Sequence, residues 1–253
     1  MSKKDRKDNK TQNNDNQKKE DSSPHVHQRD KMKEFLTIKD LKWTDKQKKF
    51  FELALNKDVK VIFINGPAGS SKSLLATYCS LKMLNEKRVS DIIYIRSAVE
   101  SSDSKLGFLP GDADEKLHFY NLPFIEKLDE LLPRSEVDRL EKEKRISMYP
   151  VNYARGMSWS AKAIIFDESQ NSTLKEITTV LTRLGQFSKC FVLADPMQTD
   201  LPHSKAGGFE KCFTLFNNEE SKQQGIYTFE FQEEDIMRSD LVRFLVKKFK
   251  ELT

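Results

Sequence analysis

The sequence predicts one α/β domain in which a mainly parallel sheet is covered by helices on both faces. Two observations predict this fold class. From residue 35 onward, short apolar runs rich in β-branched residues alternate with stretches of helical character, and such alternation is typical of parallel strands joined by crossover helices. The length of 253 residues also suits a single large domain with a tail.

The first 34 residues are mainly Lys, Asp, Asn, Gln and Ser, and they hold almost no large apolar side chain. A segment of this composition cannot bury enough apolar surface to offset the entropy lost on ordering. We therefore predict a disordered charged tail over residues 1–34 and a folded domain over residues 35–253.

The first half of the domain is predicted to alternate helix and strand twice. A helix over Asp45–Leu55 is expected because Thr44 can accept hydrogen bonds from its first turn and apolar residues recur along one side. The run Val59–Asn65 is apolar and β-branched, which is typical of a buried parallel strand. A glycine-rich turn then leads into a helix from Lys72 to about Asn85, and Asp91–Arg96 repeats the strand pattern.

The second half is predicted to continue the alternation. We expect Glu115–Leu132 to be largely helical with an interruption at Pro123, because proline has no N–H group to donate. Apolar runs and helical periodicity then predict strands over Arg145–Tyr149, Lys162–Asp167, Lys189–Asp195 and Gly225–Phe231, and helices over Leu174–Leu184, Gly208–Phe216 and Ser239–Leu252.

The composition disfavours a disulfide-rich, zinc-binding, secreted or membrane-spanning protein. Three cysteines without a CxxC pair disfavour a disulfide framework or a zinc site and favour small buried thiols in a reducing compartment. The N-terminus lacks the apolar core of a signal peptide, and no run approaches the ~20 apolar residues of a membrane span, so we expect a cytoplasmic protein with no membrane partner. The net charge of +4 permits a nucleic-acid partner without arguing for one.

The turn between the first strand and the second helix is the first candidate site. A strand–turn–helix junction presents backbone N–H groups and the positive end of a helix dipole to a phosphate. Lys72 is predicted to reach the β- and γ-phosphates of ATP, and the Ser73 hydroxyl is predicted to ligate Mg²⁺. The predicted ATP-binding loop comprises Gly66, Pro67, Ala68, Gly69, Ser70, Ser71, Lys72 and Ser73.

The loop departs from the usual P-loop pattern at one residue. Ser71 occupies the place before the lysine where that pattern has glycine. If the φ angle of Ser71 is negative, serine fits at little cost, and if it is positive, the Cβ strains the loop.

Two further strand ends carry polar side chains. The run Lys162–Asp167 is followed at once by Glu168, and we predict that Asp167 helps to hold Mg²⁺ while Glu168 acts as general base toward the attacking water. Gln198 lies just beyond the next strand. Because carboxyl ends of parallel strands share one edge of a sheet, Gln198 is predicted to sense the γ-phosphate.

Aromatic and basic residues are interleaved between residues 97 and 161. Such residues can stack on bases and neutralise phosphates in a single-stranded nucleic acid. They can equally belong to the core or to a subunit contact. The aromatic residues concerned are Phe108, Phe119, Tyr120, Tyr149, Tyr153 and Trp159.

Several blocks of the sequence resemble those of the PhoH-like ATPases, in the same order. They include GPAGSSKS, LGFLPGD at Leu106–Asp112, IIFDESQN, DPMQTDLP at Asp195–Pro202 and FEFQEEDIMRSDLV. The resemblance covers roughly Trp43 to the C-terminus. It implies a RecA-like P-loop NTPase domain similar to the first half of superfamily 1 helicases, with ATP and Mg²⁺ as cofactors.

The same resemblance implies roles for residues outside the three strand ends. Gln47 is similar to a glutamine that reads the adenine edge, although a solvated helix glutamine is an equal alternative. Arg238 is similar to a late arginine that contacts the γ-phosphate, with Arg155 and Arg183 as rival arginine fingers. Single-stranded RNA or DNA is the expected partner, and a homo-oligomer, such as a ring, is the expected assembly.

Two other functions stay open at this point. A P-loop kinase of a small molecule would need an acceptor pocket and an arginine-bearing lid, whereas Glu168 and Gln198 favour activation of water. A nucleotide-binding assembly protein with little turnover would be consistent with Ser71, whereas Lys72, Glu168 and Gln198 together favour hydrolysis.

Overall fold

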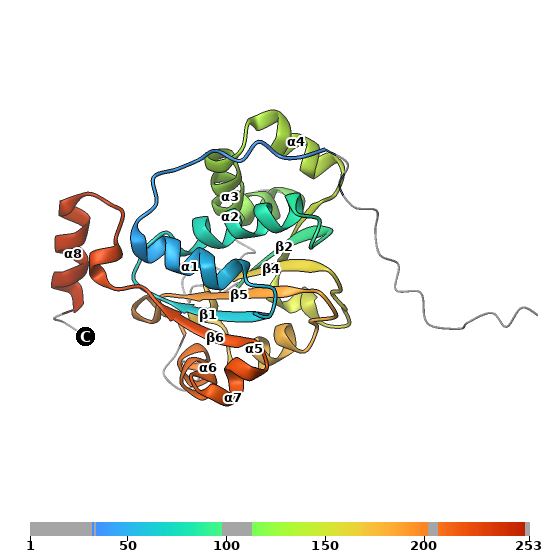
Figure 1. The fold of residues 1–253 in the computed structure, drawn as a ribbon. Helices are drawn as coiled ribbons and strands as arrows, with labels where there is room; N and C mark the ends of the chain where they lie inside the picture. Colours follow the sequence, from blue (N-terminus) through green and yellow to red (C-terminus); the bar gives the residue numbers. More distant parts are fainter. Residues whose placement is uncertain (1–31, 33, 98–112, 202–206, 251–253) are drawn as a thin grey trace, which may run out of the picture.

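The computed structural model describes residues 32, 34–97, 113–201 and 207–250. Within this part of the chain, six strands form one sheet in the order β3-β2-β4-β5-β1-β6, and every neighbouring pair is parallel (Figure 1). The predicted fold class, an α/β domain with a parallel sheet between helices, is therefore confirmed. The strands are β1 Val61–Asn65, β2 Asp91–Arg96, β3 Ile146–Pro150, β4 Lys162–Asp167, β5 Lys189–Ala194 and β6 Ile226–Glu230.

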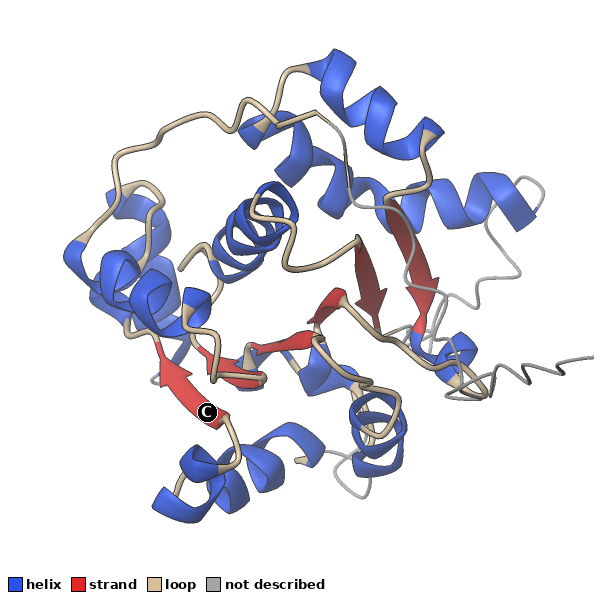
Figure 2. Ribbon diagram, turned by 45° about the vertical axis from the view of Figure 1, so that its right-hand side comes forward, coloured by secondary structure: helices blue, strands red, loops and turns tan. Residues whose placement is uncertain are grey.

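Helices lie on both sides of this sheet (Figure 2). The apolar residues of α1, α2 and α3 join one buried cluster with one face of the strands, and those of α5 and α6 join a second cluster with the other face. All three cysteines are buried and free, as predicted. The described helices are α1 Asp45–Leu55, α2 Lys72–Asn85, α3 Ala113–Leu131, α4 Arg134–Lys142, α5 Leu174–Leu181, α6 Gly208–Phe216, α7 Glu219–Gln223 and α8 Asp240–Lys250.

Helix α3 corrects one prediction, because it runs through Pro123 without interruption. An interior proline costs about 3 kcal/mol relative to alanine. Just beyond it, Phe124, Leu128 and Leu131 are at most 1% exposed, and the Phe124 ring stacks on Tyr94 with centroids 4.7 Å apart. Burial of three large apolar side chains, at about 1.5–3 kcal/mol each, outweighs the cost of the proline.

Helices α4 and α7 have no counterpart in the sequence prediction. Helix α4 is mostly charged, and its inward side consists of Val137 and Leu140 alone. Helix α7 has five residues, of which Ser221 is the buried one. Helices this short or this polar lack the apolar periodicity on which a prediction depends. The other predicted elements are present, with ends that differ by up to three residues.

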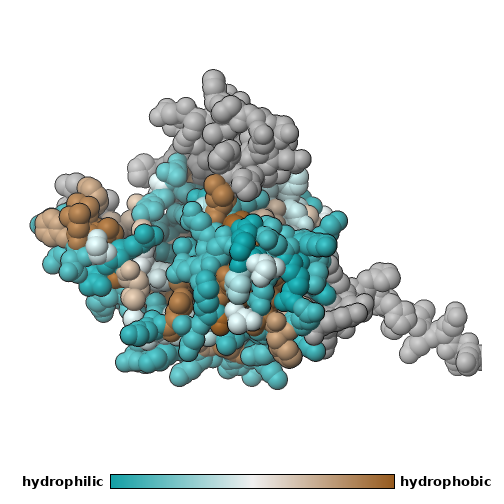
Figure 3. All heavy atoms as spheres, turned by 90° about the horizontal axis from the view of Figure 1, so that it is seen from above, coloured by the Kyte–Doolittle hydropathy of each residue, from teal (hydrophilic) through white to brown (hydrophobic). Residues whose placement is uncertain are grey.

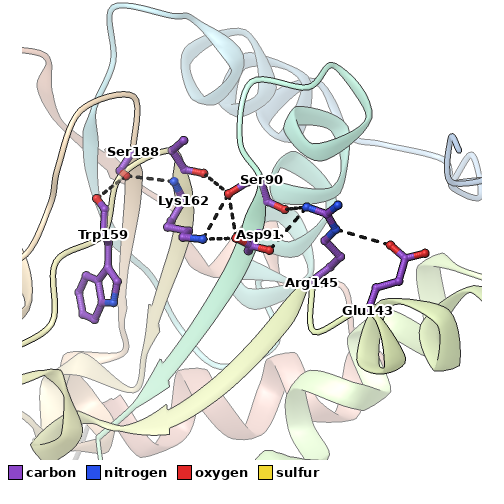
Figure 4. A network of polar contacts seen from close by, with 8 residues as sticks. Ser90, Asp91, Glu143, Arg145, Trp159, Lys162 and Ser188 are labelled. Carbon is purple, nitrogen blue, oxygen red and sulfur yellow. Dashed lines mark hydrogen bonds and ion pairs between the residues drawn. The ribbon is translucent and has the colours of Figure 1, made fainter. Parts of the chain in front are cut away.

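Charged side chains also hold the amino ends of three strands together (Figure 4). Asp91 of β2 is buried; it accepts a hydrogen bond of 2.8 Å from the Ser90 hydroxyl and pairs with Lys162 of β4. The Arg145 guanidinium, just before β3, donates to the Ser90 carbonyl over 3.0 Å and lies 3.8 Å from Asp91. This network fixes the sheet at the edge opposite the loops that follow the strands.

Two parts of the chain lie at the limits of the domain. Two residues of the predicted tail are described: Met32 is 4% exposed and belongs to the first apolar cluster, and Glu34 pairs with Arg139 of α4. The rest of the predicted tail lies outside the described residues. Helix α8 stands beside the β6 edge in Figure 1, and its apolar side is visible at the left of Figure 3. That side exposes Leu241, Phe244, Leu245 and Phe249.

Among the described helices, none is both long enough and apolar enough to cross a bilayer.

Candidate nucleotide site

The carboxyl ends of β1, β4 and β5 open into one cavity of about 710 Å³. Strand β5 lies between β1 and β4, so the loops after all three strands face the same space. The cavity has the size of a typical ligand pocket of about 300–1,000 Å³. The predicted site residues that line it are Gln47, Ala68, Gly69, Ser71, Lys72, Ser73, Asp167, Glu168, Gln198 and Arg238. The predicted loop residues Gly66, Pro67 and Ser70 are not among the residues that line the cavity.

Lys72 lies inside the glycine-rich loop. Its Nζ donates to the Gly66 carbonyl over 2.7 Å and to the Pro67 carbonyl over 3.0 Å. Burial lowers the pKa of Lys72, and the nearby carboxylates of Asp195 and Asp167 partly oppose that shift. An incoming phosphate would exchange these neutral acceptors for charged ones, which form stronger hydrogen bonds.

Gly69 is required by the conformation of the loop. Its φ is +84°, and a Cβ at this position would lie 2.8 Å from Cγ of Arg238. The Met237 N–H donates to the Gly69 carbonyl over 2.9 Å. The segment after β6 therefore packs directly on the loop, which brings Arg238 to the cavity.

The φ angle of Ser71 is positive, which is the alternative that strains the loop. Its φ is +65° and its ψ is +19°, in the left-handed region, and its side chain makes no capping hydrogen bond to α2. Left-handed backbone costs a non-glycine residue roughly 1–2 kcal/mol. Ser71 thus has a backbone conformation that glycine adopts without strain, with the extra Cβ in place.

Ser73 and Asp167, the two residues predicted to hold Mg²⁺, are in direct contact. The Ser73 hydroxyl donates to Asp167 Oδ2 over 2.7 Å, and the Tyr94 hydroxyl donates to the same oxygen over 3.1 Å. A hydroxyl and a carboxylate are hard oxygen donors, which suit Mg²⁺ when phosphate oxygens and waters complete its shell. Asp167 is 8% exposed, so a cation there would satisfy a nearly buried charge. The donor set therefore fits the predicted Mg²⁺.

Glu168 follows β4 in a left-handed conformation, with φ +53°. Its side chain lines the cavity and is 36% exposed. Burial raises the pKa of Glu168, and the negative charge of Asp167 adds to the effect, whereas hydrogen bonding from Gln170 and the charge of Arg96 oppose it. Non-glycine residues in left-handed backbone gather at functional sites because the surrounding structure must impose them.

The sequence prediction missed Gln170. This residue is 1% exposed. Its Nε2 donates to Glu168 Oε2 over 2.6 Å, and its Oε1 accepts a hydrogen bond of 3.1 Å from the Asp195 N–H. One amide therefore connects the predicted base to the loop that carries Gln198. A glutamine two residues after a strand-end carboxylate was the available signal, but its spacing does not reveal its direction.

Gln47 and one of the three candidate arginines line the cavity. Gln47 lines the cavity and is 3% exposed, and its Oε1 accepts a hydrogen bond of 2.9 Å from the Thr44 N–H in a capping box. Arg238 also lines the cavity. The Arg183 carbonyl accepts from the Trp159 N–H near the amino edge of the sheet, and neither Arg183 nor Arg155 lines the cavity. A role for these two would require a neighbouring subunit.

The aromatic residues between positions 97 and 161 differ in burial, and not all of them are described. Trp159 is 4% exposed and belongs to the second apolar cluster, and Tyr149 packs against that cluster. Tyr153 is 64% exposed. Phe108 and the LGFLPGD block lie outside the described residues, and the side chains of Phe119 and Tyr120 are likewise not described.

Residues 41–250 match the protein family described as PhoH-like protein. The chain belongs to this family. Among curated relatives, the PhoH-like protein of Synechocystis sp. is 32% identical over 207 residues, covering 82% of this chain and 61% of that protein. The PhoH-like protein of Bacillus subtilis is 33% identical, covering 75% and 58%, and Protein PhoH of Escherichia coli is 33% identical, covering 72% and 51%.

This PhoH-like chain therefore spans between half and about three fifths of the length of these relatives. Among solved structures, the crystal structure of Pif1 helicase from Candida albicans matches 76% of this chain and 40% of that chain, with a TM-score of 0.37 and 16% identity. A likeness at that level carries no argument about activity.

Proposed function

We propose that this PhoH-like domain binds ATP and hydrolyses it with Mg²⁺. The observation that carries the proposal is the convergence of Lys72, Asp167, Glu168 and Gln198 on one cavity from three adjacent strand ends. Each of these side chains serves chemistry at a γ-phosphate more than it serves folding. A site that only held a nucleotide would not need a carboxylate and an amide beyond the phosphate loop.

Each residue has a distinct task in the proposed reaction. Lys72 would neutralise the β- and γ-phosphates, and Ser73 with Asp167 would hold Mg²⁺, which supplies positive charge to the phosphate oxygens when bound. Glu168 would accept a proton from the attacking water. Gln198 would orient that water or report the loss of the γ-phosphate, and Arg238 would stabilise charge in the transition state.

Single-stranded RNA or DNA is the proposed partner of this ATPase. The support is the family resemblance together with exposed polar surface beside the nucleotide cavity, described below. The chain contains one such domain over its matched length, so movement along a strand would need other copies or another protein. We propose a homo-oligomer in the cytoplasm, for which the apolar side of α8 is the candidate contact.

The proposal is tested by phosphate release from ATP with and without Mg²⁺, in the presence of single-stranded RNA, single-stranded DNA or neither. Glu168→Gln should abolish release without abolishing ATP binding, and Glu219→Gln, which alters an exposed carboxylate of α7, should release phosphate like the wild type. Binding of ATP without release would favour the nucleotide-binding assembly protein. ATP consumption only with an added small-molecule acceptor would favour the kinase.

A further inference from the structure

A second cavity, of about 660 Å³, adjoins the nucleotide cavity. The two cavities share Glu168 and Gln198, so the predicted base and the predicted sensor form the partition between them. The described residues that line the second cavity are Arg96, Ser97, Glu168, Asn171, Met197, Gln198, Thr199 and Asp200. All of them lie at or just beyond the carboxyl ends of β2, β4 and β5.

Hydrogen bonds fix the far wall of this cavity. The Asp200 N–H donates to Asn171 Oδ1 over 2.7 Å, and Asn171 Nδ2 donates to Asp200 Oδ2 over 3.3 Å. The Ser97 hydroxyl donates to the Asn171 carbonyl over 2.6 Å. Because three strand ends are tied in this way, the cavity is a built feature of the sheet edge. The Asp200 carboxylate is already engaged within its wall.

Arg96 is the one cation among the described lining residues. Its Nη2 lies 4.0 Å from Glu168 Oε1, and the two side chains are 29% and 36% exposed. A separation of 4.0 Å is too long for a hydrogen bond, so the contact between Arg96 and Glu168 is an ion pair without a hydrogen bond, and an anion bound at Arg96 can compete with it. A guanidinium offers donors in a planar fork that matches the oxygens of a phosphate.

We propose that the second cavity is a phosphate subsite, and that a phosphate bound to Arg96 draws the guanidinium away from Glu168 and thereby frees this carboxylate to turn toward the attacking water. Arg96 is then a positioning residue, because it acts through Glu168. The control of hydrolysis rests on the ATPase function proposed above, whereas the binding of phosphate does not.

Two sources of phosphate fit this chemistry. One is a phosphodiester of a single-stranded polynucleotide, which would couple binding of the strand to hydrolysis. The other is the inorganic phosphate released from ATP, which would pass Arg96 as it leaves across the shared partition. The first source predicts that an oligonucleotide stimulates hydrolysis, and the second predicts that inorganic phosphate does so at saturating ATP.

The test compares the full chain with Arg96→Gln, Arg96→Lys and Arg134→Gln, the last of which alters an arginine in a surface ion pair of α4. ATP hydrolysis is measured alone, with single-stranded oligonucleotide and with inorganic phosphate. Arg96→Gln should raise the basal rate about two- to fivefold, the effect of one exposed ion pair, and should respond to neither addition. Arg96→Lys keeps the positive charge but lacks the planar guanidinium. Its basal rate and its response to the additions should lie between those of the wild type and Arg96→Gln.

Loss of oligonucleotide stimulation in Arg96→Gln identifies the phosphodiester source. Loss of stimulation by inorganic phosphate in Arg96→Gln, measured at saturating ATP, identifies the released product. If Arg96→Gln and Arg96→Lys both respond to oligonucleotide and to phosphate as Arg134→Gln does, the proposal is wrong.

A measurement without turnover separates this proposal from the ATPase function. Oligonucleotide anisotropy and calorimetric titration with inorganic phosphate are carried out with a non-hydrolysable ATP analogue present. If the wild type hydrolyses no ATP but Arg96→Gln weakens binding of either probe about tenfold or more, the ATPase proposal fails and the subsite stands. If binding of both probes is independent of Arg96, the subsite itself is refuted.

Discussion

Replacement of Ser71 by glycine should stabilise the domain. The backbone of Ser71 is left-handed, with φ +65°, and relief of this conformation is worth about 1–2 kcal/mol. Glycine also gives the unfolded chain more freedom, which costs about 0.5–1 kcal/mol. The side chain makes no capping hydrogen bond that would be lost. The net increase in the free energy of unfolding should be about 0.5–1 kcal/mol.

The same substitution should leave nucleotide affinity nearly unchanged. If phosphate binding preserves the loop conformation, the strain at Ser71 cancels between the free and the bound states. We therefore expect the dissociation constant of an ATP analogue to change by less than about threefold, which is under 1 kcal/mol.

Urea unfolding and analogue titration measure the two quantities independently. Ser71→Ala keeps the Cβ and removes only the hydroxyl, so it should not stabilise the protein. Lys144→Gly is the matched control, because Lys144 has φ +53° at the end of α4, away from the cavity, and it should stabilise by a similar amount. A Ser71→Gly protein no more stable than Ser71→Ala would refute the assignment of strain to the backbone.

Three further outcomes follow from buried polar groups. Gln170→Met should lower kcat for ATP at least tenfold with KM unchanged, because it removes the hydrogen bond that positions Glu168 without touching the phosphate loop; an equal change in KM would contradict this. Asp91→Ala should lower the free energy of unfolding in urea by about 3–5 kcal/mol, because Lys162 would lose its paired carboxylate and the buried Arg145 would be left with Glu143, a partner at 3.5 Å whose side chain is 42% exposed; a loss below 1 kcal/mol would show that the network is dispensable. Burial lowers the pKa of Lys189 to about 8, so the unfolded state binds more protons than the folded state between pH 8 and about 10.5, and stability should rise with pH in that window by up to about 3 kcal/mol. The rise should be absent in Lys189→Met when urea midpoints are compared from pH 7.5 to 10.

The sequence was sufficient to predict the elements and residues that obey local rules. Apolar strands and the glycine-rich turn follow from periodicity and turn chemistry, so Lys72, Ser73 and Asp167 could be placed at one sheet edge before any coordinates. The φ of Ser71 could be reduced to two alternatives but not chosen, because backbone geometry in this loop is imposed by its neighbours. Pro123 was misjudged for the same reason, since burial across α3 decides the outcome.

The residues that the sequence could not assign depend on contacts between distant segments. Of Arg155, Arg183 and Arg238, only Arg238 lines the cavity. The contact that places it there is the hydrogen bond from the Met237 N–H to the Gly69 carbonyl. No local pattern around any of the three arginines contains that information.

The position of Glu168 shows the same dependence most clearly. Gln170 holds one of its oxygens and also binds the loop after β5, while Arg96 approaches the other oxygen from β2. In the proposed mechanism, loss of a γ-phosphate near Gln198 can therefore alter the position of Glu168 through the Gln170 amide, and an anion at Arg96 can alter it through a separate contact. Because these two contacts come from different strands, nucleotide state and occupancy of the second cavity can act on Glu168 separately, and an Arg96 variant should change the response to an anion without changing the response to Gln170→Met.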